Sequence, residues 1–488
     1  MLLFLFEHKL MTQYQLYSFY RLVHPNIIYD SFRHRVDKFI KHDLLQQKKY
    51  SLSQKKNGVR QKLLQLTEKG HWFLIEAGYL PRASEFDVMV PGPKWDMTLA
   101  LKEQILHAIN AESSLSGTIV GGKYQNLYLL NHHNNQSEYK KRTIYAEDYP
   151  QFSEKVDTYE QEALSASHDH VLHSAEDISY LLPQIKGDLP IKPNWLFKVG
   201  NELIVIEIDS GYGKIGAALN KEDIANNNAT AETIKEKLIH YASFAYALNQ
   251  RLNLKVNLLY LYLDDSFPFR RPYGNKIYKV RTFKQNFLNP DNVAHDFLTV
   301  PHVFDVYVYS LERGQAIIQS LLKNVHGKGN AQEVISQTIS YIQQTLPDSK
   351  LLSPITAEEL RYSIPFEELG IDSIILYNDT EGLEKALVLF PMTEGRIYTQ
   401  HELVTLTGQI KANKHRWLLP ESTKVLCVYE KEEDMYGDVL ANSYIDKDSI
   451  LLCNLEELSQ SSAETLIFYD KHKKEVLEVD GDFGPDEI

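Results

Sequence analysis

Residues 30–66 read DSFRHRVDKFIKHDLLQQKKYSLSQKKNGVRQKLLQL, and this stretch decides how the N-terminal part of the chain is expected to fold. In its first half the apolar side chains recur at helical spacing. This predicts a helix over residues 30–45 with one buried stripe: Phe32, Val36, Phe39 and Ile40. Asp30 is placed to cap the start of that helix. The exposed side of the helix is basic and carries Arg33, His34, Arg35, Lys38 and Lys41.

The second half of the same stretch predicts a β-hairpin. Two strand-like runs, residues 47–52 and 61–66, flank the pair Asn57-Gly58, which is a strong signal for a tight turn. The segment between residues 46 and 65 has no acidic residue and six basic ones: Lys48, Lys49, Lys55, Lys56, Arg60 and Lys62. The hairpin is therefore expected to present a second positively charged surface.

The flanking segments complete the order of elements. Thr12 and Gln15 form a capping-box pattern at the start of a helix through Tyr20, and residues 67–70 lead into a further helix. The order of helix, helix, basic helix, basic hairpin and helix is that of a winged helix-turn-helix domain. In such a domain one helix enters the major groove of DNA and the wing contacts phosphates. A basic surface used for protein contacts is the alternative, and we favour DNA.

The distribution of charge agrees with a polyanionic partner. Residues 1–82, here called the N-terminal module, contain fourteen Lys and Arg against six Asp and Glu, a charge of +8. The whole chain of 488 residues carries −13, so the remainder carries −21. A small basic module on a large acidic body predicts that the module binds double-stranded DNA and that the body has another role.

Composition limits the class of protein further. No run of residues is long and apolar enough for a transmembrane helix, so no membrane partner is expected. The apolar residues 2–10 lack the basic start and the cleavage site of a signal peptide. The two cysteines, Cys427 and Cys453, each lie in an apolar run, which predicts buried thiols and fits a reducing, cytoplasmic location.

The fold class is expected to be α+β or α/β, in several domains. Four segments are predicted: residues 1–82, a winged helix-turn-helix; residues 83–165, a linker and helical region; residues 166–328, a central α/β domain; and residues 329–488, a C-terminal α/β domain of unknown role. The first boundary follows from Pro81, Pro91 and Pro93, and the last from the loop over residues 325–330.

The chemistry, if the chain has any, is expected in the central domain. Four elements are predicted there in the order strand, strand, helix, strand: residues 195–199, 203–208, 230–251 and 256–263. Alternation along the second strand puts Glu207 and Asp209 on one face. A metal-dependent nuclease needs convergent carboxylates at a strand end and a nearby lysine. Glu207 and Asp209 are therefore the predicted ligands of Mg²⁺ or Mn²⁺.

Three short motifs add a resemblance to a known family. They are Lys192-Pro193-Asn194, the run VIEIDSG over residues 205–211 and the run KLIHY over residues 237–241. Together with the winged-helix start, they resemble the replication-relaxation family of Gram-positive plasmids and mobile elements, over roughly the first half of the chain. The resemblance implies a central domain related to the PD-(D/E)XK (restriction-endonuclease-like) nuclease fold. It also implies a role in plasmid replication or in DNA relaxation and transfer, with proteins of those processes as partners.

The chain departs from the family pattern at two positions. Asn194 stands where the family has Asp, so a neutral amide replaces a charged metal ligand. Asp209 stands where an active nuclease has the Lys of Glu-x-Lys, so Lys214 or Lys237 would have to supply that lysine. The catalytic residues offered by the resemblance are therefore Glu207, Asp209, Lys237 and Asn194. Two interpretations stay open: a metal-dependent endonuclease or relaxase, and a non-catalytic scaffold in which the carboxylates are solvated or pair with Lys237.

Three functions follow as hypotheses. The first is a DNA-binding protein of a plasmid or mobile element that acts in replication or mobilisation, with or without DNA nicking. The second is a transcriptional regulator whose acidic body binds a partner or effector. The third is an adaptor that assembles a replication or transfer complex. Nicking of supercoiled DNA would favour the first, and promoter-specific repression without cleavage the second.

Overall fold

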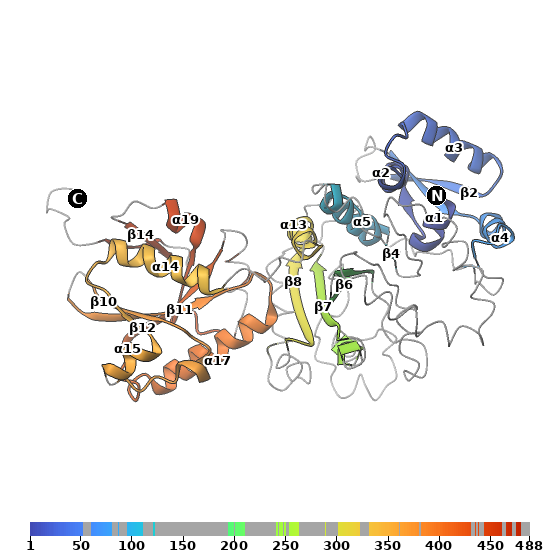
Figure 1. Cartoon of the computed structure of the whole chain (residues 1–488). Helices are drawn as coiled ribbons and strands as arrows, with labels where there is room; N and C mark the ends of the chain where they lie inside the picture. The colour runs from blue at the N-terminus through green and yellow to red at the C-terminus, as the bar shows by residue number, and fades with distance from the viewer. Residues whose placement is uncertain are drawn as a thin grey trace, which may run out of the picture. The chain divides into compact units, whose positions relative to one another are not determined.

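A computed structural model of the chain describes residues 1–51, 60–80, 86, 95–110, 121–122, 194–199, 201–209, 241–242, 244–246, 248–249, 253–262, 288, 301–322, 331–360, 362–379, 382–430, 435, 438, 444–460, 465–470 and 475–479. Contacts divide the chain into two compact units. They are Met1–Lys276 with His302–Phe304 and Tyr309–His326, and Ile277–Pro301 with Asp305–Val308 and Gly327–Ile488. The described residues form a mixed α/β protein with sheets of three, five and seven strands (Figure 1).

The N-terminal module is an antiparallel sheet of three strands with helices packed around it (Figure 1). Its elements are α1 (Leu2–His8), β1 (Met11–Thr12), α2 (Gln13–Val23), α3 (Tyr29–Lys41), β2 (Leu45–Ser51), β3 (Arg60–Leu66) and α4 (Glu68–Glu76). The strand order is β1-β3-β2, and β2 pairs with β3 along its whole length. The two predicted hairpin strands are therefore confirmed. The predicted turn between them lies outside the described residues, with Lys55, Lys56, Asn57 and Gly58.

One of the two predicted helix caps is confirmed, that of α2. Thr12 and Gln15 form the predicted capping box, with Gln15 N donating to Thr12 Oγ1 over 3.0 Å and Thr12 N donating to Gln15 Oε1 over 3.2 Å. The prediction that Asp30 caps α3 was wrong. The helix already begins at Tyr29 after the extended residue Ile28, so Asp30 lies inside the first turn, where its carboxylate is 3.6 Å from the Arg33 guanidinium.

The middle of the chain forms a sheet of five strands, here called the central sheet. Its strands are β4 (Gly121–Gly122), β5 (Trp195–Val199), β6 (Glu202–Asp209), β7 (Lys255–Tyr262) and β8 (Phe304–Ser310), in that spatial order. β5 and β6 are antiparallel and β6 and β7 are parallel. The described residues between 241 and 249 are helical, so the predicted order of strand, strand, helix, strand is confirmed for the described part.

Helices cover both faces of the central sheet. α5 (Trp95–Asn110) packs against α13 (Leu311–Leu322), and both contact the sheet. A Cβ atom added at Gly314 of α13 would lie 3.4 Å from the side chain of Leu261, so α13 lies on the face that carries Leu261. Register pairs Leu261 with Ile208, and alternation therefore puts Glu207 on the opposite face, where the helical segment around Tyr241 packs.

The second unit is built on the sheet of seven strands. Its elements are α14 (Ala331–Thr345), β9 (Lys350–Leu352), α15 (Pro354–Glu359), α16 (Phe366–Leu369), β10 (Ile374–Asn378), β11 (Glu384–Pro391), α17 (Ile397–Asn413), β12 (Ser422–Tyr429), β13 (Ile450–Asn454), α19 (Leu455–Gln460), β14 (Thr465–Tyr469) and β15 (Glu475–Val479). The strand order is β15-β14-β13-β12-β11-β10-β9, with β11, β12 and β13 parallel. Figure 1 shows α14 and α19 on one side of this sheet and α15 and α17 on the other.

Alternating strand residues fill the two cores of this second unit. Cys427 of β12 belongs to the core beneath α17, and Cys453 of β13 belongs to the core beneath α14. Both thiols are buried and unpaired, as the sequence predicts. Burial raises the pKa of each thiol above its usual value, so both act as small apolar side chains. None of the helices in the described part of the chain combines the length and the apolar character needed to span a bilayer.

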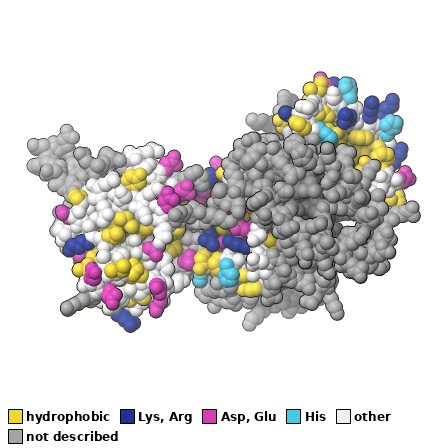
Figure 2. Space-filling model, viewed as in Figure 1, with side chains coloured by type: hydrophobic (Ala, Val, Ile, Leu, Met, Phe, Trp, Pro, Cys, Tyr) yellow, Lys and Arg dark blue, Asp and Glu magenta, His cyan; other side chains and the backbone are white. Residues whose placement is uncertain are grey.

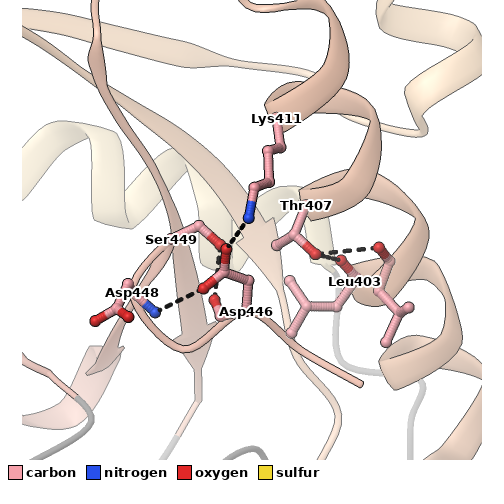
Figure 3. Close-up of polar contacts among 7 residues, drawn as sticks. Leu403, Thr407, Lys411, Asp446, Asp448 and Ser449 are labelled. Atoms are coloured by element: carbon pink, nitrogen blue, oxygen red, sulfur yellow. Dashed lines mark hydrogen bonds and ion pairs between the residues drawn. The ribbon is translucent and has the colours of Figure 1, made fainter. Parts of the chain in front are cut away.

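Polar contacts fix α17 to the segment that enters β13 (Figure 3). Lys411 Nζ lies 2.9 Å from Asp446 Oδ2, while the other carboxylate oxygen of Asp446 accepts from Asp448 N over 3.2 Å. Ser449 Oγ donates to the backbone carbonyl of Asp446 over 2.7 Å. Asp446 therefore closes its own turn and joins it to the helix.

Candidate functional site

Glu207 lies near the end of β6, and its side chain is only 5% exposed. Its carboxylate accepts a hydrogen bond from the phenol of Tyr241, which is itself 1% exposed. Tyr241 is the last residue of the KLIHY run, so the sequence did contain a signal for it. The residue predicted from that run was Lys237, not Tyr241. Lys237 lies outside the described residues, as does Lys214.

Asn194 is held by the backbone of β6. Its side-chain oxygen Oδ1 accepts a hydrogen bond from Ile208 N over 3.0 Å, and its own backbone N–H donates to Ile206 O over 3.0 Å. Asn194 thus extends the pairing of β5 with β6 by one residue. A carboxamide in this position satisfies a backbone donor, which is a structural role that needs no charge.

The neighbours of the two predicted metal ligands on β7 are aromatic. Register pairs Glu207 with Tyr260 and Asp209 with Tyr262. The rings of Tyr260 and Tyr262 are 5.4 Å apart, and both side chains are buried. The surroundings of Glu207 in the described part of the chain are therefore phenolic rather than acidic.

The described groups do not by themselves form a site for a divalent metal ion. Mg²⁺ requires six oxygen ligands in near-octahedral geometry. The described residues contain no cluster of three or more His, Cys, Asp or Glu side chains that could hold a metal. The described side chains here supply one carboxylate, that of Glu207, and it accepts from a phenol; the backbone of Asp209 is described but its side chain is not. We therefore derive no catalytic step through a metal.

The predicted DNA-binding residues of α3 are all exposed: Arg33, His34, Arg35, Lys38 and Lys41. Phe32 and Val36, on the opposite side, are fully buried, whereas Phe39 and Ile40 are half-buried. The predicted buried stripe is therefore confirmed for two of its four residues. Figure 2 shows Lys, Arg and His side chains gathered over this part of the N-terminal module.

The hairpin contributes further basic side chains. Lys49 and Lys62 are exposed and lie directly opposite each other on β2 and β3. Lys48 is half-buried, with its ammonium 5.8 Å from the centre of the Trp95 ring. Arg60 lies in β3, although its side chain is not described. Like charges directly opposite each other destabilise a strand pair. The Lys49 and Lys62 pair is therefore unfavourable unless something negative lies nearby.

Helix α5 fastens the N-terminal module to the rest of the first unit. Gln15 Nε2 donates to Leu99 O over 2.9 Å and to the Glu103 carboxylate over 2.9 Å. Leu99 also shares a small apolar core with Leu10 and Leu63. A helix within the predicted linker and helical region thus completes the core of the module.

A buried lysine and histidine lie at the same junction. Lys102 of α5 donates to the backbone carbonyl of His8 over 2.7 Å and to that of Leu10. Burial lowers the pKa of Lys102 well below its usual value. Burial and then the charge of Lys102 lower the pKa of His8. The His8 ring stacks on Trp195 of β5 with 4.5 Å between centroids, so α1 contacts the central sheet as well. No pattern in the sequence predicted a role for Lys102 or His8.

Comparison with known proteins finds one local similarity. A stretch of 147 residues is 26% identical to the DNA mismatch repair protein MutL of Endomicrobium trichonymphae. The match covers 29% of this chain and 24% of the MutL chain, so the chain spans about a quarter of that relative's length. No protein-family model matches, and no solved structure matches.

Proposed function

We propose that the chain is a double-stranded-DNA-binding protein whose N-terminal module is a winged helix-turn-helix. The order α1, β1, α2, α3, β2, β3 and α4 supports this proposal, with α3 as the helix that enters the major groove and β2 and β3 as the wing. The observation that carries it is the exposed lysine pair Lys49 and Lys62. A cross-strand pair of like charges costs about 0.2–1 kcal/mol in isolation, and phosphate groups would offset that cost.

We propose further that the protein acts on a plasmid or mobile element, in replication or mobilisation. The resemblance of its motifs to the replication-relaxation family supports this role. The local similarity to MutL, which is a DNA repair protein by name, agrees with a DNA substrate. Plasmid replication or transfer proteins are the expected partners.

For the central domain we propose a nuclease-like scaffold that does not cut DNA. Two contacts support this interpretation: the Asn194 amide is used by the backbone of β6, and the Glu207 carboxylate is used by Tyr241. The same contacts favour the second candidate function, a transcriptional regulator with a winged helix and a non-catalytic body. Nicking with Mg²⁺ or Mn²⁺ through Glu207, Asp209 and Lys214 or Lys237 is the competing proposal.

Two measurements on the full-length chain test these proposals. Binding to duplex DNA should weaken steeply as salt rises, because phosphate contacts release counterions. Affinity that does not change between low and physiological salt would contradict the DNA proposal. Supercoiled plasmid with Mn²⁺ should remain intact with the wild type, Glu207→Gln and Asn194→Asp. Nicking by the wild type that Glu207→Gln abolishes would instead establish the nuclease.

A further inference from the structure

The polar residues on the exposed side of α3 form a central stripe with one arginine on each flank. One set forms a single stripe at spacings of three, seven and ten residues from its first member: Ser31, His34, Lys38 and Lys41. All four side chains are exposed, and the stripe points directly away from the buried side chains Phe32 and Val36. Its members are therefore the side chains that project farthest from the core of the module.

The two arginines of α3 lie on the flanks of this stripe. Arg33 precedes His34 by one residue and Arg35 follows it by one. Each arginine is therefore turned about 100° away from His34 around the helix axis, in opposite directions. Each has a partner inside the module. Arg33 lies 3.6 Å from the carboxylate of Asp30, and Arg35 Nη1 donates to the Tyr20 hydroxyl over 3.0 Å. Both contacts are exposed and weak, so the position of the arginines beside the stripe follows from the register of the helix.

We propose that the stripe of Ser31, His34, Lys38 and Lys41 reads base edges, whereas Arg33 and Arg35 contact the phosphates on either side of the groove. This inference rests on the proposed function and assigns its specificity. Composition alone would favour the arginines for base contacts, because Arg is the commonest reader of guanine. The register of α3 and the contacts of the two arginines favour the opposite division.

The dimensions of a helix in a groove agree with this assignment. The major groove is about 12 Å wide, close to the diameter of a helix with its side chains, so residues on the flanks meet the phosphate walls. The stripe extends over ten residues, or about 15 Å, which corresponds to about four base pairs. Lys38 and Lys41 suit the O6 and N7 acceptors of guanine.

Two acidic residues beside the stripe narrow the choice of bases. Asp30 and Asp37 are exposed and lie between the stripe and Arg33 on the helix surface. Carboxylates repel phosphate but accept a hydrogen bond from the amino group of cytosine. The bound site is therefore expected to contain G·C pairs within the window of about four base pairs that the stripe spans.

The test uses the full-length chain and a library of random duplexes. The wild type first selects the duplex that it binds best. The affinity for this duplex and for a scrambled duplex is then measured at several salt concentrations, for the wild type, His34→Ala, Lys38→Ala and Arg35→Ala. Lys38→Ala and Arg35→Ala are matched, since each removes one positive charge from the exposed side of the same helix. Thermal unfolding confirms that the variants remain folded.

Lys38→Ala and His34→Ala should lower the ratio of specific to scrambled affinity, by about 5- to 150-fold for Lys38→Ala. Arg35→Ala should lower both affinities by the same factor and reduce the salt dependence by about one phosphate contact. The inference is overturned if Arg35→Ala relaxes the sequence preference while both stripe variants leave the ratio unchanged. A wild type that enriches no duplex overturns the proposed DNA function itself, which is a different outcome.

Discussion

Two buried polar side chains of the second unit, Asp438 and Asn454, contrast with the exposed basic side chains of the N-terminal module. In the second unit Asp438 is 3% exposed and accepts hydrogen bonds from Gly395 N, Gln400 Nε2 and the Tyr429 hydroxyl, over 3.1, 2.6 and 2.8 Å. Asn454 is fully buried and is bonded at both ends to Glu457. In the N-terminal module the stripe of α3 is exposed, and Lys49 lies opposite Lys62.

This difference separates charges that belong to the fold from charges that need a partner. A buried carboxylate with three donors is compensated inside the protein, and removing it leaves those donors without a partner. Lys49 opposite Lys62 has no such compensation among the described residues, and like charges in this position weaken the sheet that carries them. Glu207 of the central sheet shares features of both kinds of charge. It is buried and accepts a hydrogen bond from Tyr241, but it occupies a position where the family resemblance predicts a metal ligand.

The largest effect is expected at Asp438. Asp438→Ala should lower the free energy of unfolding of the second unit by about 3 kcal/mol, because three buried donors lose their acceptor. Asp438→Asn keeps the shape of the side chain and should cost less. Hydrogen exchange of peptides from β12, followed by mass spectrometry, measures both. A cost within experimental error for Asp438→Ala would mean that Asp438 is a charge available to a ligand, and the contrast between the regions would fail.

Lys102 differs from the exposed lysines of the N-terminal module, because it is buried and donates hydrogen bonds to backbone carbonyls of that module. Its pKa is lowered by burial, so between that lowered pKa and about 10.5 the unfolded chain binds a proton that the folded chain lacks. Unfolding therefore takes up a proton, and stability rises with pH in that window.

The pH dependence can be assigned to Lys102 by substitution. Within that window this one group can add at most about 1.4 kcal/mol to the free energy of unfolding for each unit of pH. Lys102→Met lacks this titrating group, so the free energy of unfolding of the variant should not show that increase with pH. Urea unfolding of the wild type and the variant at each pH measures the difference. An unchanged pH slope in Lys102→Met would show that the lysine stays charged and is compensated in some other way.

At the central sheet we expect an effect no larger than that at Asp438. Glu207→Gln and Tyr241→Phe should each destabilise the first unit by about 1–3 kcal/mol, because each leaves a buried polar group without its partner. The double variant should cost less than the sum of the two single variants, since both remove the same hydrogen bond. Additive costs would indicate that Glu207 and Tyr241 act independently. Glu207 would then again be a candidate metal ligand.

Local patterns in the sequence predicted the parts of the fold that neighbouring residues decide. The capping box of Thr12 and Gln15, the strands on either side of residues 52–59 and the two faces of α3 all depend on residues close together in the chain. Asp30 failed as a cap for a local reason as well. The helix began at Tyr29, which moved the carboxylate into the first turn, where it lies near Arg33.

Long-range contacts explain what the sequence did not reveal. Gln15 binds Leu99, and Lys102 binds the carbonyl of His8, across separations of 84 and 94 residues. No periodicity within either segment reports such a contact, so a lysine on a helix was not recognised as buried. Tyr241 is different, because the KLIHY motif contained it. Lys237 was predicted from this motif instead, because a nuclease site requires a lysine.

The smallest effect is expected at the hairpin, where stability and binding should change in opposite directions. Lys49→Gln removes the repulsion between Lys49 and Lys62, so it should raise the free energy of unfolding by about 0.2–1 kcal/mol. The same substitution should weaken binding to all duplex sequences alike and reduce the salt dependence by about one phosphate contact. Lys69→Gln, on the exposed side of α4, is the matched control. It makes the same change of charge outside the hairpin and should leave stability within about 0.5 kcal/mol. If Lys49→Gln destabilised the protein, Lys49 would belong with the charges that the fold compensates, and the hairpin would no longer support binding to a polyanion.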